Sequence, residues 1–170
     1  MQKSNKKIKN ATVCSSNGIT FKSQLEKSIY NTLQQLGFNV QYEPVTHVLW
    51  DNFIPITPFY DRESDTQRTK RIDKGDTNKK RCLVQKSGKI TGIRYTPDFY
   101  FKYKDLDVYI EAKGVENDVF YIKKKMFRKY LDDKYIQTKQ SSIFFEIYTK
   151  SQLLQAVDII KKYAESLQKD

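Results

Sequence analysis

Two neighbouring segments joined by a short turn restrict the fold of this chain more than any other feature. Residues 93–103 are rich in Tyr and Phe, and residues 106–113 form a second apolar run that Gly114 closes. Aromatic and β-branched residues favour strands, and the turn over residues 102–105 predicts that the two strands pair as an antiparallel hairpin. A chain of 170 residues is long enough to form one domain with a single core.

Apolar residues recur at helical spacing in three further segments, which begin near residues 23, 118 and 150. Residues 38–50 and 143–148 have strand character. We therefore expect an α/β (α+β) fold, with a mixed central sheet flanked by helices in the order α-β-β-β-α-β-α. The side chains predicted to face the core are Leu25, Ile29, Leu33 and Leu36 in the first helix, Val119, Ile122, Met126 and Tyr130 in the second, and Leu153, Val157, Ile160 and Tyr163 in the third.

Two segments differ in composition from the rest of the predicted domain, which spans residues 1–170. Residues 1–20 are polar and basic, which predicts a flexible basic arm or a strand that docks elsewhere. Residues 55–92 combine prolines and glycines with many Lys and Arg, and only residues 82–84 have strand character. We expect a basic insertion, part loop and part hairpin, because loops of this length in compact domains are usually functional or disordered.

The charge balance indicates the kind of partner. A formal net charge of +11 favours a polyanion, although charge alone does not separate DNA, RNA and an anionic membrane. Cys14 and Cys82 form no CxxC motif, which argues against a thiolate zinc site. No apolar segment is long enough to span a bilayer, so we expect a cytoplasmic protein of a bacterial or phage-infected cell, without a membrane partner.

Charged residues stand at the ends of the two hairpin strands. Glu111 and Lys113 are two residues apart and so point to the same face, while Asp98 lies on the neighbouring strand. Two carboxylates can converge there on one hard cation, with the Ala112 carbonyl as a further oxygen ligand. Such an ion is what phosphodiester hydrolysis requires, and Lys113 would stabilise charge beside it. The competing interpretation of Glu111 and Lys113 is a surface ion pair; Pro97-Asp98, the hairpin spacing and Gly114 favour the metal site.

The ordered motifs extend this site into a resemblance. Pro97-Asp98 followed by Glu111-Ala112-Lys113 resembles the PD-(D/E)xK signature of restriction-endonuclease-like nucleases. More closely, the chain resembles the phage endonuclease I family of Holliday-junction resolvases, through the four motifs Ser23-Gln24-Leu25-Glu26, Tyr42-Glu43, Tyr95-Thr96-Pro97-Asp98-Phe99 and Glu111-Ala112-Lys113-Gly114. The match runs in order over roughly residues 20–135.

The resemblance implies a role for each matched residue. Asp98 and Glu111 would bind Mg²⁺, which Mn²⁺ could replace, Lys113 would assist the attacking water, and Glu26 would complete the site from the first helix. Family members act on branched DNA as dimers, so a homodimer is expected. The family has a short connection where this chain carries residues 55–92, which leaves the choice of substrate open.

Several of these residues also have ordinary structural interpretations. Glu26 fits a capping box with Ser23, and Glu43 fits a strand face or a loop better than a metal site. His47 is the only histidine and is expected to be a strand residue without a catalytic role. Basic residues that could contact DNA phosphates, or equally form solvated faces, are Lys79, Lys80, Arg81, Arg94, Lys123, Lys124, Lys125 and Arg128.

Three alternatives to a junction nuclease remain open at this point. One is a transposase-like or restriction-like nuclease of the same fold that acts on linear DNA. Another is a nucleic-acid-binding module that keeps the fold without activity, although every expected acidic and lysine position is present. The last is a basic structural or packaging protein, which would leave the ordered motifs without a reason.

Overall fold

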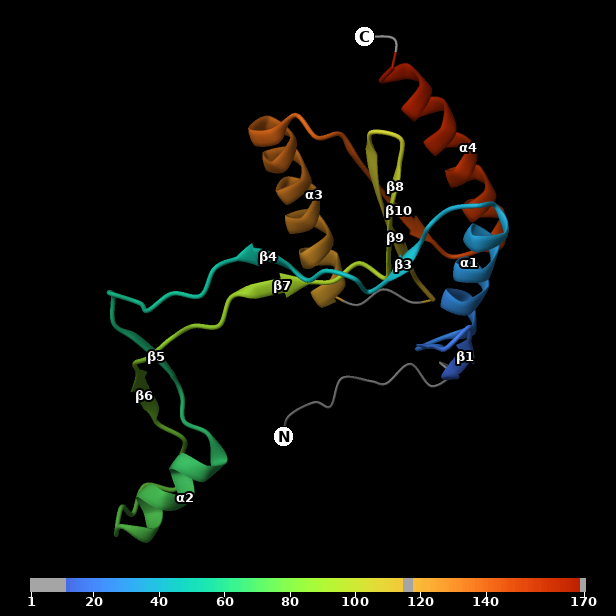
Figure 1. Ribbon diagram of the computed structural model, residues 1–170. Coiled ribbons are helices and arrows are strands. Elements are labelled where there is room, and N and C mark those ends of the chain that lie inside the picture. Colours follow the sequence, from blue (N-terminus) through green and yellow to red (C-terminus); the bar gives the residue numbers. More distant parts are fainter. Residues whose placement is uncertain (1–11, 115–117, 169–170) are drawn as a thin grey trace. The chain divides into compact units, whose positions relative to one another are not determined.

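The computed structural model describes residues 12–114 and 118–168, and the chain divides into two compact units (Figure 1). The core unit comprises the described residues up to Leu49 and from Arg94 onward, and the insertion unit is Trp50–Ile93. The sequence predicted one domain with an insertion over residues 55–92. The second unit therefore starts five residues before the predicted insertion and ends one residue after it.

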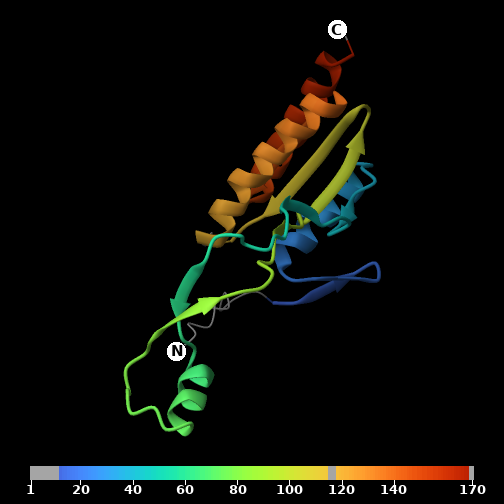
Figure 2. The same ribbon diagram turned by 90° about the vertical axis from the view of Figure 1, so that its left-hand side faces the viewer.

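A four-stranded mixed sheet forms the centre of the core unit. Its strands lie in the order β10 (Ser142–Ile147), β9 (Leu106–Ala112), β8 (Phe99–Tyr103) and β3 (Gln41–Tyr42). β9 is parallel to β10 and antiparallel to β8, and β3 is antiparallel to β8. The mixed α+β class is confirmed, and so is the predicted hairpin, which is the long yellow pair of strands in Figure 2.

The predicted first strand of the hairpin is not continuous. The structure divides residues 93–103 into β7 (Ile93–Tyr95) and β8, with a bend at Thr96–Asp98 between them. Pro97 explains the break, because proline lacks the N–H that a sheet ladder needs. The bend sets Asp98 at the start of β8, directly beside the end of β9.

Helices cover both faces of this sheet. α1 (Gln24–Gln35) and α4 (Lys150–Ser166) pack against one face, and α3 (Asp118–Thr138) packs against the other (Figure 1). Leu106, Val108 and Ile110 of β9 point into the first layer, while Tyr109 points into the second. The consequence is that Leu106–Glu111 is buried along its whole length, as expected of a strand covered on both sides.

The buried face of α3 differs from the one predicted. Phe120, Phe127 and Leu131 are buried, whereas Val119 and Ile122 are more than half exposed. The helix carries apolar residues on several faces, so spacing alone did not decide which face turns inward. Contacts with the sheet decide it, since the Phe127 ring packs 5.4 Å from that of Tyr109. In the other two helices, the side chains predicted to face the core are buried or half-buried, except the last one in each, Leu36 and Tyr163, which are exposed.

A short hairpin precedes α1 in the core unit. β1 (Cys14–Ser16) and β2 (Ile19–Phe21) pair through a turn in which Asn17 and Gly18 both have positive φ, as tight hairpin turns require. Phe21 is fully buried against the rings of Tyr30 and Tyr42. The sequence predicted a flexible basic arm, or a strand that docks elsewhere, over residues 1–20. Residues 14–20 belong to this hairpin, so the flexible arm is wrong for them, and residues 1–11 lie outside the described residues.

The insertion unit is built from two paired strands and one helix. β5 (Phe59–Arg62) pairs antiparallel with β6 (Leu83–Lys86), and α2 (Asp65–Asp73) lies between them in the chain. A capping box of Ser64 and Gln67 starts α2, which the sequence analysis did not anticipate. β4 (His47–Trp50) and β7 pair where the chain leaves and re-enters the core unit.

An ion pair, and not an apolar core, occupies the centre of the insertion unit. Glu63, at 2% exposure, is the one buried residue between Trp50 and Ile93. Arg71 donates from Nε and Nη2 to its carboxylate at 3.0 and 2.7 Å, and the Cys82 N–H donates at 3.1 Å. Arg71 also donates to the carbonyls of Asn78 and Lys80 at 2.9 and 2.8 Å, so this single side chain joins α2 to the loop before β6.

None of the helices in the described part of the chain combines the length and the apolar character needed to cross a membrane.

Candidate active site

Asp98 and Glu111 come together at one end of the central sheet. Phe99 pairs with Ile110, so the residue before β8 lies next to the residue near the end of β9. Asp98 Oδ2 accepts a hydrogen bond from the Ala112 N–H at 2.8 Å. The two acidic residues predicted to share a site therefore stand on adjacent chain segments, held there by strand pairing.

The Glu111 carboxylate is almost completely enclosed, with 4% exposure. Its Oε2 accepts from the Tyr95 hydroxyl at 2.6 Å, and its Oε1 lies 2.5 Å from Lys113 Nζ. Lys113 Nζ also lies 4.0 Å from the centre of the Phe120 ring. Glu111 and Lys113 thus share a face of the chain as predicted, and Tyr95 fixes the orientation of the carboxylate from the other side.

Glu26 reaches the same region from the start of α1. Ser23 caps the helix by accepting from the Glu26 N–H, which is half of the predicted capping box. The Glu26 carboxylate accepts instead from the Lys22 N–H at 2.9 Å, the Ser23 hydroxyl at 2.8 Å and the Tyr42 hydroxyl at 2.6 Å. These bonds turn the carboxylate toward β3, where Tyr42 pairs with Phe99.

Electrostatics show that these carboxylates are close enough to act on one another. Burial, together with the negative charges of Glu111 and Glu26, raises the pKa of Asp98 to about 8, despite the opposing effects of the Ala112 N–H and the Lys113 charge. The pKa of the Tyr95 hydroxyl is also raised, by burial and by the Glu111 carboxylate. The cluster is therefore short of positive charge, which is the condition that a bound cation relieves.

The donor set fits a hard divalent ion in chemical kind. Carboxylate and carbonyl oxygens are the ligands that Mg²⁺ prefers, and Asp98, Glu111 and Ala112 supply both types. Within residues 12–114 and 118–168, however, no three His, Cys, Asp or Glu side chains are grouped as a ready-made metal site. Each carboxylate is turned toward a protein donor, namely Tyr95, Tyr42 or the Ala112 N–H.

Glu43 and Lys22 border this cluster, although Glu43 was predicted to be a strand-face or loop residue and no role was predicted for Lys22. Glu43 follows β3 with a φ of 45°, and its N–H donates to the Asp98 carbonyl at 2.8 Å. Its carboxylate forms an ion pair with Lys22. That pair raises the pKa of Lys22, as do the charges of Asp98 and Glu26. The left-handed backbone of a non-glycine residue is uncommon and is found where surrounding contacts enforce it.

Tyr95 and Tyr42 were quoted only as parts of motifs, yet they carry the hydrogen bonds that orient Glu111 and Glu26. Their positions next to the acidic residues were the available indication. Which hydroxyl meets which carboxylate depends on pairing between strands distant in sequence, and periodicity does not reveal that.

The basic residues of α3 fall into two groups. Lys124 is buried, lies 2.8 Å from Glu146 and is held beneath the surface, so it does not serve as the exposed phosphate contact that the sequence suggested. Arg128 reaches the same carboxylate at 3.2 Å but remains exposed. Glu146 is the strand partner of Glu111, so Lys124 neutralises an acid beside the cluster. Lys123 is half-buried and Lys125 is exposed.

The remaining predicted contacts lie elsewhere. Lys79 and Lys80 are exposed in the insertion unit, and Arg81 forms an ion pair with Asp65 there. Arg94 is exposed on β7 of the core unit. His47 is packed on β4 among the rings of Tyr109, Phe127 and Tyr130, which fits the strand position predicted for it.

Comparisons of this chain with protein-family models, with curated proteins and with solved structures found no match, so its function has to be inferred from the residues and geometry described above.

Proposed function

We propose that this chain is a divalent-metal-dependent endonuclease that hydrolyses phosphodiester bonds in branched DNA. The observation that carries the proposal is the meeting of Asp98 and Glu111 at one sheet end, with Lys113 2.5 Å from Glu111. A carboxylate whose pKa is raised by burial and by neighbouring acids, and which lies near a lysine, has the character of a metal-dependent hydrolytic site.

The proposal includes a PD-(D/E)xK core for the fold. Support comes from the order in which the sheet and its covering helices occur along the chain: α1, β3, β8, β9, α3, β10 and α4. The acidic residues stand on β9 and at the start of β8, and α1 contributes Glu26. Residues of this kind on strand ends are held more rigidly than residues on loops would be.

Each side chain has a defined task in this account. Asp98, Glu111 and the Ala112 carbonyl would hold Mg²⁺, or Mn²⁺ in its place, and Glu26 would add negative charge from α1. When bound, the ion would supply an activated water and neutralise charge on the phosphate. Lys113 offers its ammonium to the developing charge on the scissile phosphate. Tyr95 and Tyr42 hold Glu111 and Glu26 in position through hydrogen bonds of 2.6 Å each.

DNA is the proposed partner because the net charge of +11 favours a polyanion and because the chemistry suits a phosphodiester. Exposed or half-exposed basic residues that could contact phosphates are Lys79, Lys80, Arg81, Arg94, Lys123, Lys125 and Arg128. Preference for branched DNA and action as a homodimer rest on the family resemblance alone.

The test is cleavage of a synthetic four-way junction and of a linear duplex of matched sequence, with Mg²⁺, with Mn²⁺ and with a chelator. We expect metal-dependent cutting of the junction that Glu111→Gln abolishes. Asp107→Asn is the matched control, because Asp107 lies on the same face of β9 but pairs with Lys134 outside the cluster. Equal cutting of both substrates would support nuclease activity but contradict the preference for branched DNA. Binding of DNA without cutting would refute the proposed nuclease activity.

A further inference from the structure

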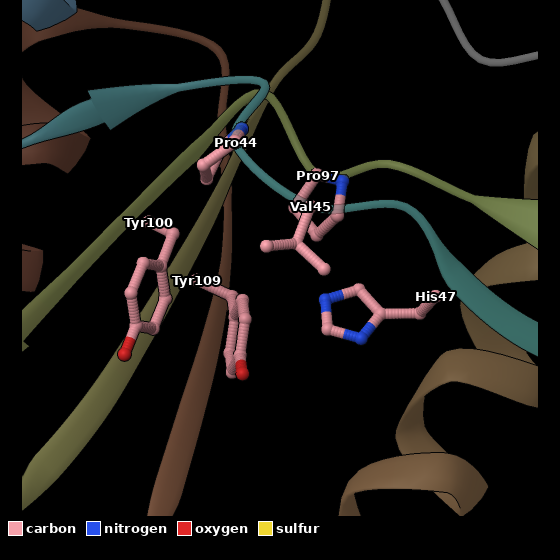
Figure 3. A pocket seen from close by; sticks show the side chains of 6 residues that line it. All are labelled: Pro44, Val45, His47, Pro97, Tyr100 and Tyr109. Carbon is pink, nitrogen blue, oxygen red and sulfur yellow. The ribbon is translucent and has the colours of Figure 1, made fainter.

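A cavity of about 170 Å³ lies in the core unit, and two of its lining residues, Pro97 and Pro44, adjoin Asp98 and Glu43 in the chain (Figure 3). Its walls come from the segment between β3 and β4, from the bend before β8, and from β8 and β9 themselves. The lining residues are Pro44, Val45, His47, Pro97, Tyr100 and Tyr109. None of them belongs to the insertion unit, so the cavity is a property of the core unit alone.

Rigid aromatic rings form two of the cavity walls. The rings of Tyr100 and Tyr109 lie side by side with centroids 5.2 Å apart, and their hydroxyls point the same way (Figure 3). The Tyr100 hydroxyl donates to Asp107 at 3.0 Å, and Lys134 Nζ donates to the Tyr109 hydroxyl at 3.4 Å. Both rings are therefore held in place by hydrogen bonds at their far ends, and a ligand would not need to order them.

His47 forms an adjoining wall, since its imidazole contacts the Tyr109 ring edge to face with centroids 5.6 Å apart. Its imidazole is drawn beside Tyr109 in Figure 3. The rings of Phe127 and Tyr130 also pack against it, with centroids 5.2 and 5.1 Å away. Burial and the charge of Lys134 lower the pKa of His47, so the ring is neutral near pH 7 and offers one donor and one acceptor. The cavity thus combines flat apolar surfaces with polar atoms at its edge.

The volume restricts what could occupy this space. A cavity of about 150 Å³ accommodates a benzene ring, whereas sites for drug-sized ligands measure about 300–1,000 Å³. At about 170 Å³, the cavity suits a single planar ring system, such as one nucleobase, and is too small for a larger ligand.

The cavity is joined to the carboxylates through the backbone. Pro97 directly precedes Asp98, and Pro44 directly follows Glu43, whose N–H donates to the Asp98 carbonyl at 2.8 Å. Tyr100 follows Asp98 by two residues and Tyr109 precedes Glu111 by two, so each ring lies on the same face as its acid and about 6–7 Å along the strand. A nucleotide whose phosphate lay at the two acids could therefore reach these rings with its base. Nucleic-acid bases stack on aromatic side chains, and an unpaired base costs least to remove from its helix.

We propose that this cavity binds an unpaired nucleobase adjoining the phosphate that is cut. The inference rests on the proposed nuclease function and specifies its substrate as DNA with an unstacked nucleotide next to the scissile bond. An apolar protein side chain is the less suitable occupant, because the chain is strongly basic and the cavity edge is polar.

The test uses two DNA duplexes that contain 2-aminopurine, a base whose fluorescence falls when it stacks. In one duplex this base is a one-nucleotide bulge, and in the other it is paired. Both are titrated with full-length Glu111→Gln protein in Ca²⁺, so that binding is measured without cutting. We expect the bulged probe to be quenched and the paired probe to be unaffected. We expect Tyr100→Leu to abolish the quenching and weaken binding of the bulged probe about tenfold, in line with the loss of one stacked base.

Two matched variants control for folding. Tyr103→Leu changes another half-buried tyrosine of β8 that does not line the cavity, and should keep the quenching. Tyr100→Phe keeps the aromatic ring while losing the hydrogen bond to Asp107, and should also keep it. Equal quenching by the Tyr100→Leu and Tyr103→Leu proteins would overturn the proposal, as would tight binding of the bulged probe without quenching.

Cleavage by the otherwise wild-type protein in Mg²⁺ separates this inference from the proposed function. Cutting that Glu111→Gln abolishes but Tyr100→Leu leaves unchanged would refute the base-binding cavity and keep the nuclease. Quenching that depends on Tyr100, without any cutting, would keep the cavity and refute the nuclease. A change in oligomeric mass on Tyr100→Leu, with quenching unchanged, would assign the cavity to a protein side chain and overturn the proposal.

Discussion

Each of the two units of this chain contains a carboxylate with a shifted pKa, and the shift is downward in one unit and upward in the other. In the insertion unit Arg71 forms two hydrogen bonds with Glu63, which lower the pKa of Glu63, and Glu63 raises that of Arg71. In the core unit, burial and neighbouring acids raise the pKa of Asp98 to about 8. The Glu63 charge is paired with a guanidinium within its own unit, whereas Asp98 lies among acids with Lys113 as the neighbouring cation, and we propose that a metal ion binds there. This contrast separates the Glu63–Arg71 ion pair from the cluster that we propose binds a metal ion.

The same two units differ in what holds them together. The core unit buries apolar side chains on both faces of its sheet, whereas the insertion unit buries no apolar side chain at all. Apolar burial is the main stabilising contribution in folded domains. The stability of the insertion unit should therefore depend on the Glu63–Arg71 pair more strongly than the stability of the core unit depends on any single polar pair.

The largest effect is expected from opening the core. Phe127→Ala should lower the free energy of unfolding of the core unit by about 3–5 kcal/mol, because the ring is fully buried and packs against Tyr95 and Tyr109. Phe53→Ala in the insertion unit is the matched control, and it should cost less than about 0.5 kcal/mol, since Phe53 is 41% exposed. Chemical denaturation measures both; equal losses would contradict the contrast between the units.

Glu111→Gln should separate binding from structure. We expect DNA cleavage to fall by more than about a hundredfold, because even outer partners of metal ligands contribute 10–100-fold. The melting temperature should stay level or rise, since one acid is removed from a repelling cluster. Cleavage kinetics and thermal melting measure the two effects, and a large loss of stability would make Glu111 a structural residue like Glu63.

Tyr95→Phe tests how tightly the cluster is oriented. Removing the hydroxyl that donates to Glu111 at 2.6 Å should lower the cleavage rate about tenfold, as loss of an outer hydrogen-bond partner does. Tyr60→Phe removes the hydroxyl of an exposed tyrosine in the insertion unit and should have no effect. Equal rates for both variants would mean that Tyr95 does not position Glu111.

Glu63→Gln should affect the insertion unit alone. Without the carboxylate, Arg71 keeps its ion pair with Asp76, but the bonds that join Glu63 to Arg71 and to the Cys82 N–H weaken. The contacts between α2 and the loop before β6 should weaken with them. Limited proteolysis with trypsin should cut residues 50–93 several times faster, roughly tenfold at most, while the core fragments persist. Unchanged cutting of the insertion unit would show that Glu63 and Arg71 do not hold it together.

The smallest effect is expected from acid. The pKa of Glu63 is lower in the folded unit than in the unfolded chain, so its contribution is complete above the unfolded value of about 4.3 and is lost as the pH falls through the folded value. The insertion unit should therefore open below about pH 4. Trp50, the single tryptophan, reports this by fluorescence, and Glu63→Gln should remove this part of the pH dependence.

The sequence predicted best those features that depend on neighbours along the chain. The β8–β9 hairpin follows from two apolar segments and a short turn, and the shared face of Glu111 and Lys113 follows from their spacing. Together they bring Asp98 beside the end of β9. These are local consequences of strand geometry, so composition and spacing are sufficient to predict them.

Features that depend on distant contacts were missed or assigned wrongly. α2 has no apolar stripe, and its capping box at Ser64 was the only local indication of it. The inward face of α3 is selected by the rings of the sheet. Lys124 belongs to a run of three lysines, and only the neighbouring strand, with Glu146, shows that it is the buried one.

Titration of Mn²⁺ into the DNA-free protein, followed by calorimetry, tests the central claim most directly. The account predicts binding that Glu111→Gln abolishes and that Glu63→Gln leaves intact, because the acids around Asp98 outnumber the one lysine beside Glu111, whereas Glu63 already has Arg71. Binding that survives Glu111→Gln, or no binding at all, would contradict it.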